Sequence, residues 1–216
     1  MALLVKICGL STPETVATAV AAGADMVGFM FYPRSPRNVS VETSAALADL
    51  ARGRATIVAV MVDPTDEALE TITAGLKPDL LQLHGSESAE RVSEIRQRFG
   101  IPVMKVLAIA TAQDLAPIPE YAGLVDSFLF DAKPSPSTAH SLPGGNGISF
   151  DWRLVKGLEP GKPALLSGGL NASNVADAIR LTGMGGVDVS SGVESRPGEK
   201  DPAMIEAFIA AARSAL

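Results

Sequence analysis

Residues 163–192 read PALLSGGLNASNVADAIRLTGMGGVDVSSG and carry the clearest signal of the fold. A short apolar run, Pro163–Ser167, is followed by an amphipathic segment, Ala172–Leu181, and then by a second apolar run, Gly186–Ser190. Brief runs rich in Val, Ile and Leu are typical of parallel strands that are covered on both faces. The segment therefore predicts a strand, a helix and a second strand, with a loop containing glycine after each strand.

The same alternation extends over the whole chain. We expect strands at Leu3–Cys8, Asp25–Phe31, Thr56–Val62, Asp79–His84, Pro102–Leu107, Ser127–Asp131, Pro163–Ser167 and Gly186–Ser190. We expect helices after them at Pro13–Ala22, Val41–Arg52, Asp66–Ala74, Ser88–Phe99, Ala112–Tyr121, Asp151–Gly157, Ala172–Leu181 and Ala203–Leu216. Strict alternation of strands and helices at this length predicts one α/β domain over residues 1–216, a (βα)8 or TIM barrel.

An open, doubly wound sheet is the alternative fold. It usually has fewer strands and a glycine fingerprint after the first strand, where this chain has Gly9 alone, so the barrel is favoured. Two segments depart from the regular pattern. Residues Ala132–Gly147 form a long loop rich in Pro, Ser and Gly, a type that tends to be functional, and Val193–Asp201 is predicted to be a polar turn.

Composition limits the classes of partner. The chain has 216 residues, a net charge of −6 and a pI near 5.0, so it has no cationic excess for nucleic acid or an anionic membrane surface. No apolar run approaches the roughly 20 residues that span a bilayer. The single cysteine, Cys8, excludes an internal disulfide and favours the cytoplasm. Only two histidines, His84 and His140, are present, without zinc spacing, so we predict no metal site.

In such a barrel the active site lies at the carboxyl ends of the strands, where this chain has several reactive side chains. Strand alternation places Lys6 and Cys8 on the same face. A nearby cation lowers the pKa of a thiol, so this pair could hold a reactive thiolate. A free cysteine is also commonly buried and inert, and the residues alone favour that interpretation.

Asp131 and His84 are titratable residues at two further strand ends, and the sequence leaves open whether each is functional or structural. Asp131 ends an apolar strand and could act as an acid if partial burial keeps it protonated. It could equally be a helix cap or the partner of Lys133. His84 could donate a hydrogen bond to a substrate, although a lone histidine in a strand is more often structural.

The loops after the last two strands predict a phosphate site. Glycines let backbone N–H groups approach an anion closely, and these two loops are the recurring phosphate site of the barrel fold. Ordinary turn chemistry explains either loop singly, and the presence of both at these places favours phosphate binding. The predicted phosphate-binding residues are Gly168, Gly169, Ser190, Ser191 and Gly192.

The loop after the second strand, Tyr32–Arg37, contains two prolines and two arginines. Prolines restrict the backbone, so an arginine there can be oriented with little loss of entropy. A guanidinium binds a carboxylate through two parallel hydrogen bonds. The residues alone slightly favour ordinary solvated arginines.

Taken together, these motifs resemble the phosphoribosylanthranilate isomerase family of tryptophan biosynthesis over nearly the whole chain. The matching segments are Lys6–Gly9, residues 28–37 (GFMFYPRSPR), Gln82–Gly85, Phe130–Asp131, Gly144–Gly147 with Phe150–Trp152, Gly168–Leu170 and Gly186–Glu194. The family converts N-(5-phosphoribosyl)anthranilate, an aminoaldose, into the aminoketose 1-(2-carboxyphenylamino)-1-deoxyribulose 5-phosphate. The resemblance implies this Amadori rearrangement without a cofactor.

It also implies roles for individual residues. Cys8 would be the general base that removes the sugar C2 proton, and Asp131 the general acid that protonates the ring oxygen. Arg37 would hold the anthranilate carboxylate. The resemblance therefore replaces the interpretation of Cys8 as inert and the interpretation of Arg37 as solvated. His84 and Asp188 would face the substrate in supporting roles.

Three features depart from the family pattern. Asn146 stands where the glycine loop usually has Thr or Ser, the segment from Asp131 to Gly144 is longer than usual, and Ser167 replaces a common Ala. These departures concern the geometry of the sixth loop rather than the reaction. The expected partner is a small phosphorylated substrate, with no nucleic acid and no membrane, and the protein is either a monomer or a homodimer.

Rival functions fit less well. An aminoaldose isomerase of histidine synthesis would need an aspartate where Cys8 ends the first strand. Indoleglycerol phosphate synthase would need several catalytic lysines at strand ends, and Lys6 alone does not supply that set. A scaffold that binds phosphate without catalysis would not need both Cys8 and Asp131.

Overall fold

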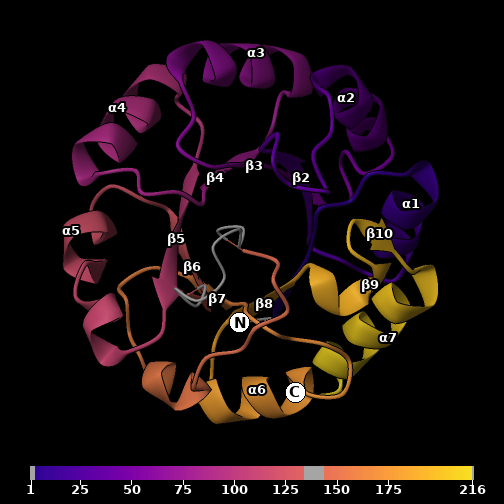
Figure 1. Cartoon of the computed structure of the whole chain (residues 1–216), viewed down its shortest axis with the longest axis vertical. Helices are drawn as coiled ribbons and strands as arrows, with labels where there is room; N and C mark the ends of the chain where they lie inside the picture. The colour runs from indigo at the N-terminus through magenta and orange to yellow at the C-terminus, as the bar shows by residue number, and fades with distance from the viewer. Residues whose placement is uncertain (1–2, 134–143, 216) are drawn as a thin grey trace.

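The computed structural model describes residues 3–133 and 144–215. In these residues eight parallel strands, each paired with the next, close into a barrel through pairing of the last with the first, which confirms the predicted TIM barrel. Figure 1 looks down the barrel and shows helices around the ring of strands. The strands are β1 (Leu4–Cys8), β2 (Met26–Phe31), β3 (Thr56–Met61), β4 (Leu80–Leu83), β5 (Val103–Ile109), β6 (Ser127–Ala132), β7 (Ala164–Leu166) and β8 (Gly186–Val189).

The helices follow the strands as the alternation predicted. Those described are α1 (Pro13–Ala21), α2 (Val41–Asp49), α3 (Asp66–Leu76), α4 (Ala89–Phe99), α5 (Ile118–Ala122), α6 (Val175–Thr182) and α7 (Pro202–Arg213). Short 3₁₀ turns are η1 (Ala112–Leu115), η2 (Trp152–Val155) and η3 (Ser191–Val193). Side-chain caps at Thr12, Ser40 and Ser88 satisfy free backbone N–H groups where α1, α2 and α4 begin.

Three predicted helices differ from the structure. The helix predicted at Ala112–Tyr121 is divided into η1 and α5 because Pro117, between them, has no N–H to donate. The helix predicted at Asp151–Gly157 is only the turn η2, which ends at Val155 because Lys156 adopts an extended backbone with φ −63° and ψ 120°. The helix predicted from Ala172 begins at Val175 because Asn174 Oδ1 accepts the Asn171 N–H at 2.8 Å and holds a turn.

The structure treats differently the two segments that depart from the alternation of strands and helices. The polar turn predicted at Val193–Asp201 is instead a two-stranded antiparallel hairpin of β9 (Glu194–Arg196) and β10 (Glu199–Lys200). Most of the long loop predicted at Ala132–Gly147, with His140, lies outside the described residues. Within the described ranges, no helix is both long and apolar enough to cross a membrane.

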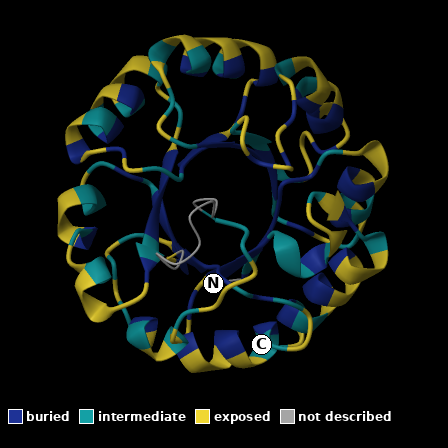
Figure 2. Ribbon diagram, in the orientation of Figure 1, coloured by how far each residue is buried: buried dark blue, intermediate teal, exposed yellow. Residues whose placement is uncertain are grey.

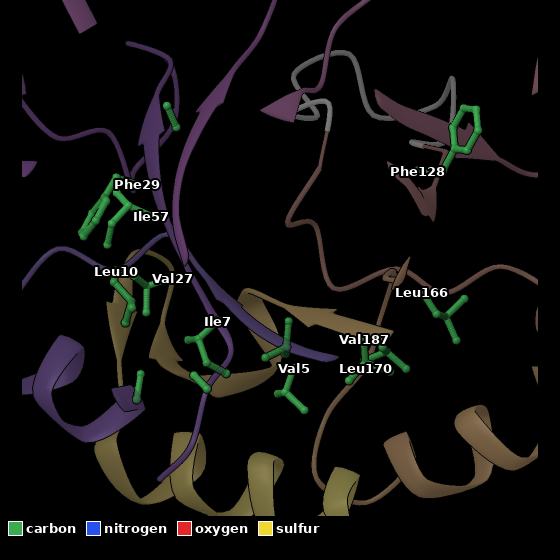
Figure 3. Close-up of a cluster of buried hydrophobic side chains, with 14 of the residues drawn as sticks. Val5, Ile7, Leu10, Val27, Phe29, Ile57, Phe128, Leu166, Leu170 and Val187 are labelled. Carbon is green, nitrogen blue, oxygen red and sulfur yellow. The ribbon is translucent and has the colours of Figure 1, made fainter. Parts of the chain in front are cut away.

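Side-chain alternation divides the core into two regions. Apolar residues on the outer face of the strands pack against the helices, and Figure 3 shows part of this layer, including Ile7, Val27, Phe29 and Val187. Figure 2 shows the barrel wall buried and the outer surfaces of the helices exposed. The inner face carries a smaller apolar cluster of Cys8, Val58, Val60, Leu80, Met104, Val106, Leu129 and Leu165. The inner face also carries the buried polar residues from which the site is built.

Candidate active site

A cavity lies at the carboxyl ends of the strands. Its lining comes from the ends of β1, β2, β6 and β8 and from the loops after β2, β4, β6, β7 and β8, which is where barrel enzymes place their active sites. Every site residue predicted from the sequence lines this cavity. These are Cys8, Arg37, His84, Asp131, Gly168, Gly169, Asp188, Ser190, Ser191 and Gly192.

Beside Cys8 lies a buried ion pair between Lys6 and Asp188, which are neighbours in the register of β1 and β8. The Lys6 Nζ–Asp188 Oδ1 distance is 2.7 Å, and Ser167 Oγ donates to Asp188 Oδ2 at 3.1 Å. A Cβ at Gly28 would lie 3.2 Å from Cys8 Sγ and 3.3 Å from Lys6 Nζ. The glycine in β2 therefore makes room for the thiol and the ammonium in the barrel.

The charges around Cys8 act in opposite directions on its pKa. Burial raises the pKa of the Cys8 thiol above its ordinary value and Asp188 adds to this rise, although Lys6 and Lys200 lower it. The expectation that a cation makes the thiol more acidic than usual is therefore wrong in its net direction. Burial acts against the charge of Lys6, but Asp188 and Cys8 together outweigh burial and hold the pKa of Lys6 above its ordinary value. At neutral pH a protonated thiol thus lies beside an ammonium–carboxylate pair.

Asp131 and His84 lie together on the opposite side of the cavity lining. His84 Nε2 is 3.3 Å from Asp131 Oδ2 but is not aligned for a hydrogen bond, and it has no hydrogen-bond partner among the described residues. His84 Nδ1 lies 3.3 Å from Gln82 Nε2. Lys133, the alternative partner predicted for Asp131, pairs instead with Asp114 at 2.6 Å. A buried polar atom without a partner is costly and is typical of a site that binds a polar molecule.

Arg37 is buried and held in place rather than solvated. Its Nε donates to Glu194 Oε1 at 2.7 Å, and its Nη2 donates to Glu194 Oε2 at 2.8 Å and to the Gly145 carbonyl at 3.1 Å. Gly9, with a φ of 78°, allows this approach because a Cβ there would be 2.7 Å from Arg37 Cδ. The lone glycine after the first strand therefore seats Arg37.

The glycine loop after β6 lies directly against these side chains. A Cβ at Gly144 would be 2.6 Å from Asp131 Oδ2 and from His84 Cε1, and a Cβ at Gly145 would be 2.5 Å from Arg37 Nη1. A side chain at Gly144 would therefore displace Asp131 or His84, and one at Gly145 would displace Arg37. Asn146, the departure from the family pattern, lines the same cavity.

The two predicted phosphate loops pack on each other. Gly168 and Gly169 have φ values of 84° and 67°, which favour glycine, and a Cβ at Gly192 would lie 1.9 Å from the Leu170 carbonyl oxygen. Ser190 precedes the turn η3, and Lys200 Nζ donates to its carbonyl at 2.8 Å and to its Oγ at 3.1 Å. The site thus combines close backbone N–H groups with a buried cation, an arrangement suited to an anion.

Sequence reasoning missed several groups that shape this site. The sequence indicated Lys6 only as a neighbour of Cys8 and Ser167 only as a departure from the family pattern. It indicated Glu194 only as the last residue of the matching segment Gly186–Glu194. Lys200 was not considered because it reaches Ser190 by the hairpin, which no spacing rule shows. In the described residues, no group of three or more His, Cys, Asp or Glu side chains is arranged to hold a metal ion.

The closed barrel, the cavity at its strand ends, and the thiol, the carboxyl and the anion site in that cavity define the class: a (βα)8-barrel enzyme that acts on a small anionic molecule. Residues 5–211 match the family model described as N-(5'-phosphoribosyl)anthranilate (PRA) isomerase. The chain belongs to this family.

Individual relatives agree with this assignment. The chain is 56% identical over 214 residues to the N-(5'-phosphoribosyl)anthranilate isomerase of Rhodopseudomonas palustris strain BisB18, covering 99% of this chain and 97% of that protein. The crystal structure of phosphoribosyl anthranilate isomerase from Thermotoga maritima matches with a TM-score of 0.87 and 33% identity, over 98% of this chain and 99% of that one. A phosphoribosyl anthranilate isomerase crystallised with reduced 1-(o-carboxyphenylamino)-1-deoxyribulose 5-phosphate matches with a TM-score of 0.83 and 32% identity, over 98% of this chain and 99% of that one.

Proposed function

We propose that this chain isomerises N-(5'-phosphoribosyl)anthranilate to 1-(o-carboxyphenylamino)-1-deoxyribulose 5-phosphate, a step of tryptophan biosynthesis. The observation that carries the proposal is the convergence of Cys8, Asp131, Arg37 and two glycine loops on one cavity. Membership of the family and the product analogue bound to a relative support it. The single cysteine supports a cytoplasmic location, where a thiol stays reduced.

The two anionic ends of the substrate fit two different parts of the cavity. The phosphate binds the backbone N–H groups of the loops at Gly168–Gly169 and Ser190–Gly192, with the charge of Lys200 behind them. The carboxylate of the anthranilate ring binds Arg37. With both ends held, the ribose lies between Cys8 and Asp131.

The reaction then needs one acid and one base. Asp131, in its protonated form, gives a proton to the ring oxygen as the C1–O bond breaks, and the anthranilate nitrogen becomes an iminium. Cys8, as the thiolate, removes the proton from C2, and the electron pair of the C2–H bond forms an enolamine. Loss of the proton from the C2 hydroxyl and protonation at C1 give the aminoketose. Positioned acids and bases each contribute about 10²–10⁴-fold.

Cys8 has to lose its proton before it acts. Because Lys6 and Lys200 both lower the pKa of the thiol against the effect of burial, these cations stabilise the thiolate when it forms. A thiolate with a raised pKa is also a stronger base toward carbon. Lys6 is therefore assigned to support the base without touching the sugar.

The test is the loss of fluorescence of N-(5'-phosphoribosyl)anthranilate with purified protein, together with complementation of a tryptophan auxotroph. Cys8→Ala and Asp131→Asn should each lower kcat by at least about two orders of magnitude while the circular dichroism spectrum stays unchanged. An inactive wild-type protein would refute the proposed function. Near-normal turnover by one variant would instead remove only that residue from its role.

A further inference from the structure

Glu194, in the hairpin β9–β10, is a buried carboxylate with four hydrogen-bond donors around it. Its Oε1 accepts from Arg37 Nε and from Lys200 Nζ, both at 2.7 Å. Its Oε2 accepts from Arg37 Nη2 at 2.8 Å and from the Gly198 N–H at 3.2 Å. Burial alone would raise the pKa of Glu194, but Arg37 and Lys200 hold it below its ordinary value, so the carboxylate is charged at neutral pH.

The hairpin holds Glu194 against the loop that carries Arg37. Gly198, at the hairpin tip, has a φ of 85°, and a Cβ there would lie 2.8 Å from the Pro36 carbonyl oxygen. At the base of the hairpin the Asp201 N–H donates to the Val193 carbonyl at 3.0 Å. The hairpin therefore packs closely on the residue next to Arg37.

Glu194 also determines which edge of Arg37 is available. Glu194 accepts hydrogen bonds from Nε and Nη2 of Arg37, and the Gly145 carbonyl accepts a second hydrogen bond from Nη2. Nη1 is the nitrogen that neither of them engages, and it lies against Gly145 in the cavity lining. Glu194 and Gly145 therefore fix the guanidinium through Nε and Nη2, and Arg37 lines the cavity in this fixed position.

We propose that Glu194 is a positioning residue that determines specificity: it orients Arg37 toward the ring carboxylate of the substrate. The inference rests on the proposed function because it takes that carboxylate as the ligand of Arg37. A long arginine side chain normally loses rotamer entropy when it binds, and an arginine that is already fixed avoids this cost. Without Glu194, the buried cations Arg37 and Lys200 would face each other with no anion between them.

The phosphate end should depend much less on Glu194. Lys200 Nζ donates to the Ser190 carbonyl and Oγ as well as to Glu194, so two of its contacts survive the loss of the carboxylate. The proposal therefore predicts a selective effect. Binding of a carboxylate should weaken, while binding of phosphate stays close to normal.

The experiment compares three ligands by isothermal titration calorimetry. They are reduced 1-(o-carboxyphenylamino)-1-deoxyribulose 5-phosphate, its aniline counterpart without the carboxylate, and inorganic phosphate. The proteins are the wild type, Glu194→Gln, Gly198→Ala and the control Glu199→Gln. Glu199 lies in the same hairpin, is exposed and pairs with Arg196, so its replacement removes one charge from the hairpin without touching Arg37.

Wild type and Glu199→Gln should bind the carboxylated analogue at least about tenfold more tightly than the aniline counterpart. In Glu194→Gln this ratio should fall below about threefold, while the Kd for phosphate changes by less than about twofold. Gly198→Ala keeps every charge but shifts the hairpin, so its ratio should be intermediate. It also tests the proposal if Glu194→Gln does not fold.

Each other result has a distinct meaning. If the wild type binds neither reduced analogue, the proposed function fails and the inference falls with it. If the wild type prefers the carboxylate and Glu194→Gln or Gly198→Ala keeps the full preference, only the inference is overturned. Equal weakening of all three ligands in Glu194→Gln would overturn it too, because that indicates general loosening. Tighter carboxylate binding would overturn it by showing that Glu194 competes with the substrate.

Discussion

Two buried lysine–carboxylate pairs lie on opposite faces of the barrel wall, and they look almost the same. Lys6 Nζ is 2.7 Å from Asp188 Oδ1, and Lys105 Nζ is 2.8 Å from Glu87 Oε2. All four side chains are at most 6% exposed. Distance and burial therefore do not distinguish the two pairs, and their surroundings have to.

The pair on the inner face borders the cavity. Lys6 lies two residues before Cys8 on the same face of β1, and Asp188 lines the cavity beside Cys8. The pair on the outer face joins loops to helices. Lys105 donates to the Gly85 carbonyl at 2.8 Å and lies 5.9 Å from the centre of the Tyr121 ring.

The comparison teaches that the face of the strand, and not the degree of burial, determines whether a lysine–carboxylate pair supports catalysis or the fold. Glu87 also accepts the backbone N–H groups of Asp63 at 2.9 Å and of Gly85 at 3.0 Å, so the outer pair fixes the loops after β3 and β4. The inner pair instead adds charge next to a thiol. A buried ion pair is weak evidence for stability by itself, and its position gives it a role.

The largest expected effect is on activity, and it belongs to the inner pair alone. Lys6→Met should lower kcat/KM by about 10²-fold or more, because the thiolate of Cys8 loses the cation that stabilises it. Lys105→Met should change kcat/KM by less than about threefold, because its charge lies on the other face of the wall. Initial rates on N-(5'-phosphoribosyl)anthranilate, measured well below the unfolding temperature, check both values. Equal losses in the two variants would break the comparison.

The next effect is on stability, and it belongs to the outer pair. Lys105→Met leaves the Glu87 carboxylate buried without its cation and should lower the free energy of unfolding by about 3 kcal/mol. Adding Glu87→Gln removes the charge but keeps an oxygen for the backbone N–H groups, so it should restore a large part of this loss. Urea denaturation of the wild type, the single and the double variant measures it. A double variant no more stable than Lys105→Met would contradict this account.

The inner face was largely predictable from the sequence. Because parallel strands end at the same side of a barrel, Cys8, His84 and Asp131 were expected at one mouth, and the family resemblance added Asp188. The glycine loops after β7 and β8 were expected there for the same reason. These predictions needed only the order of the strands.

Contacts that depend on loop geometry were not predictable. Glu194 and Lys200 meet Arg37 and Ser190 only because residues 194–200 form a hairpin, and a polar segment of that length does not reveal its pairing. The direction of the shift in the Cys8 pKa was missed because the sequence shows the neighbouring cation but not the degree of burial. Pro117 in the predicted fifth helix was a visible signal that was passed over.

The pH dependence of thiol labelling gives a finer test of the comparison. Burial raises the pKa of Cys8, so the thiol is protonated at neutral pH, and alkylation by iodoacetamide should be slow there. Its rate should climb about tenfold per pH unit through and beyond the ordinary range of a thiol. In Lys6→Met the whole curve of rate against pH should shift to higher pH, since Lys6 lowers the pKa of Cys8, whereas Lys105→Met should follow the wild type. Cys8 is the only cysteine, so the mass of the labelled protein is unambiguous.

The smallest expected effect concerns the side-chain hydrogen bond that Ser167 donates to Asp188. The Ser167 Oγ donates to Asp188 Oδ2 at 3.1 Å. Since Lys6 still holds Oδ1 at 2.7 Å, Ser167→Ala should cost about 1 kcal/mol at most, which is about a fivefold loss in kcat/KM. A loss as large as that of Lys6→Met would mean that the hydroxyl, rather than the ammonium, sets the position of Asp188. Ser167, and not Lys6, would then be the functional partner of Asp188. The similar distances in Lys6–Asp188 and Lys105–Glu87 would in that case carry no functional meaning.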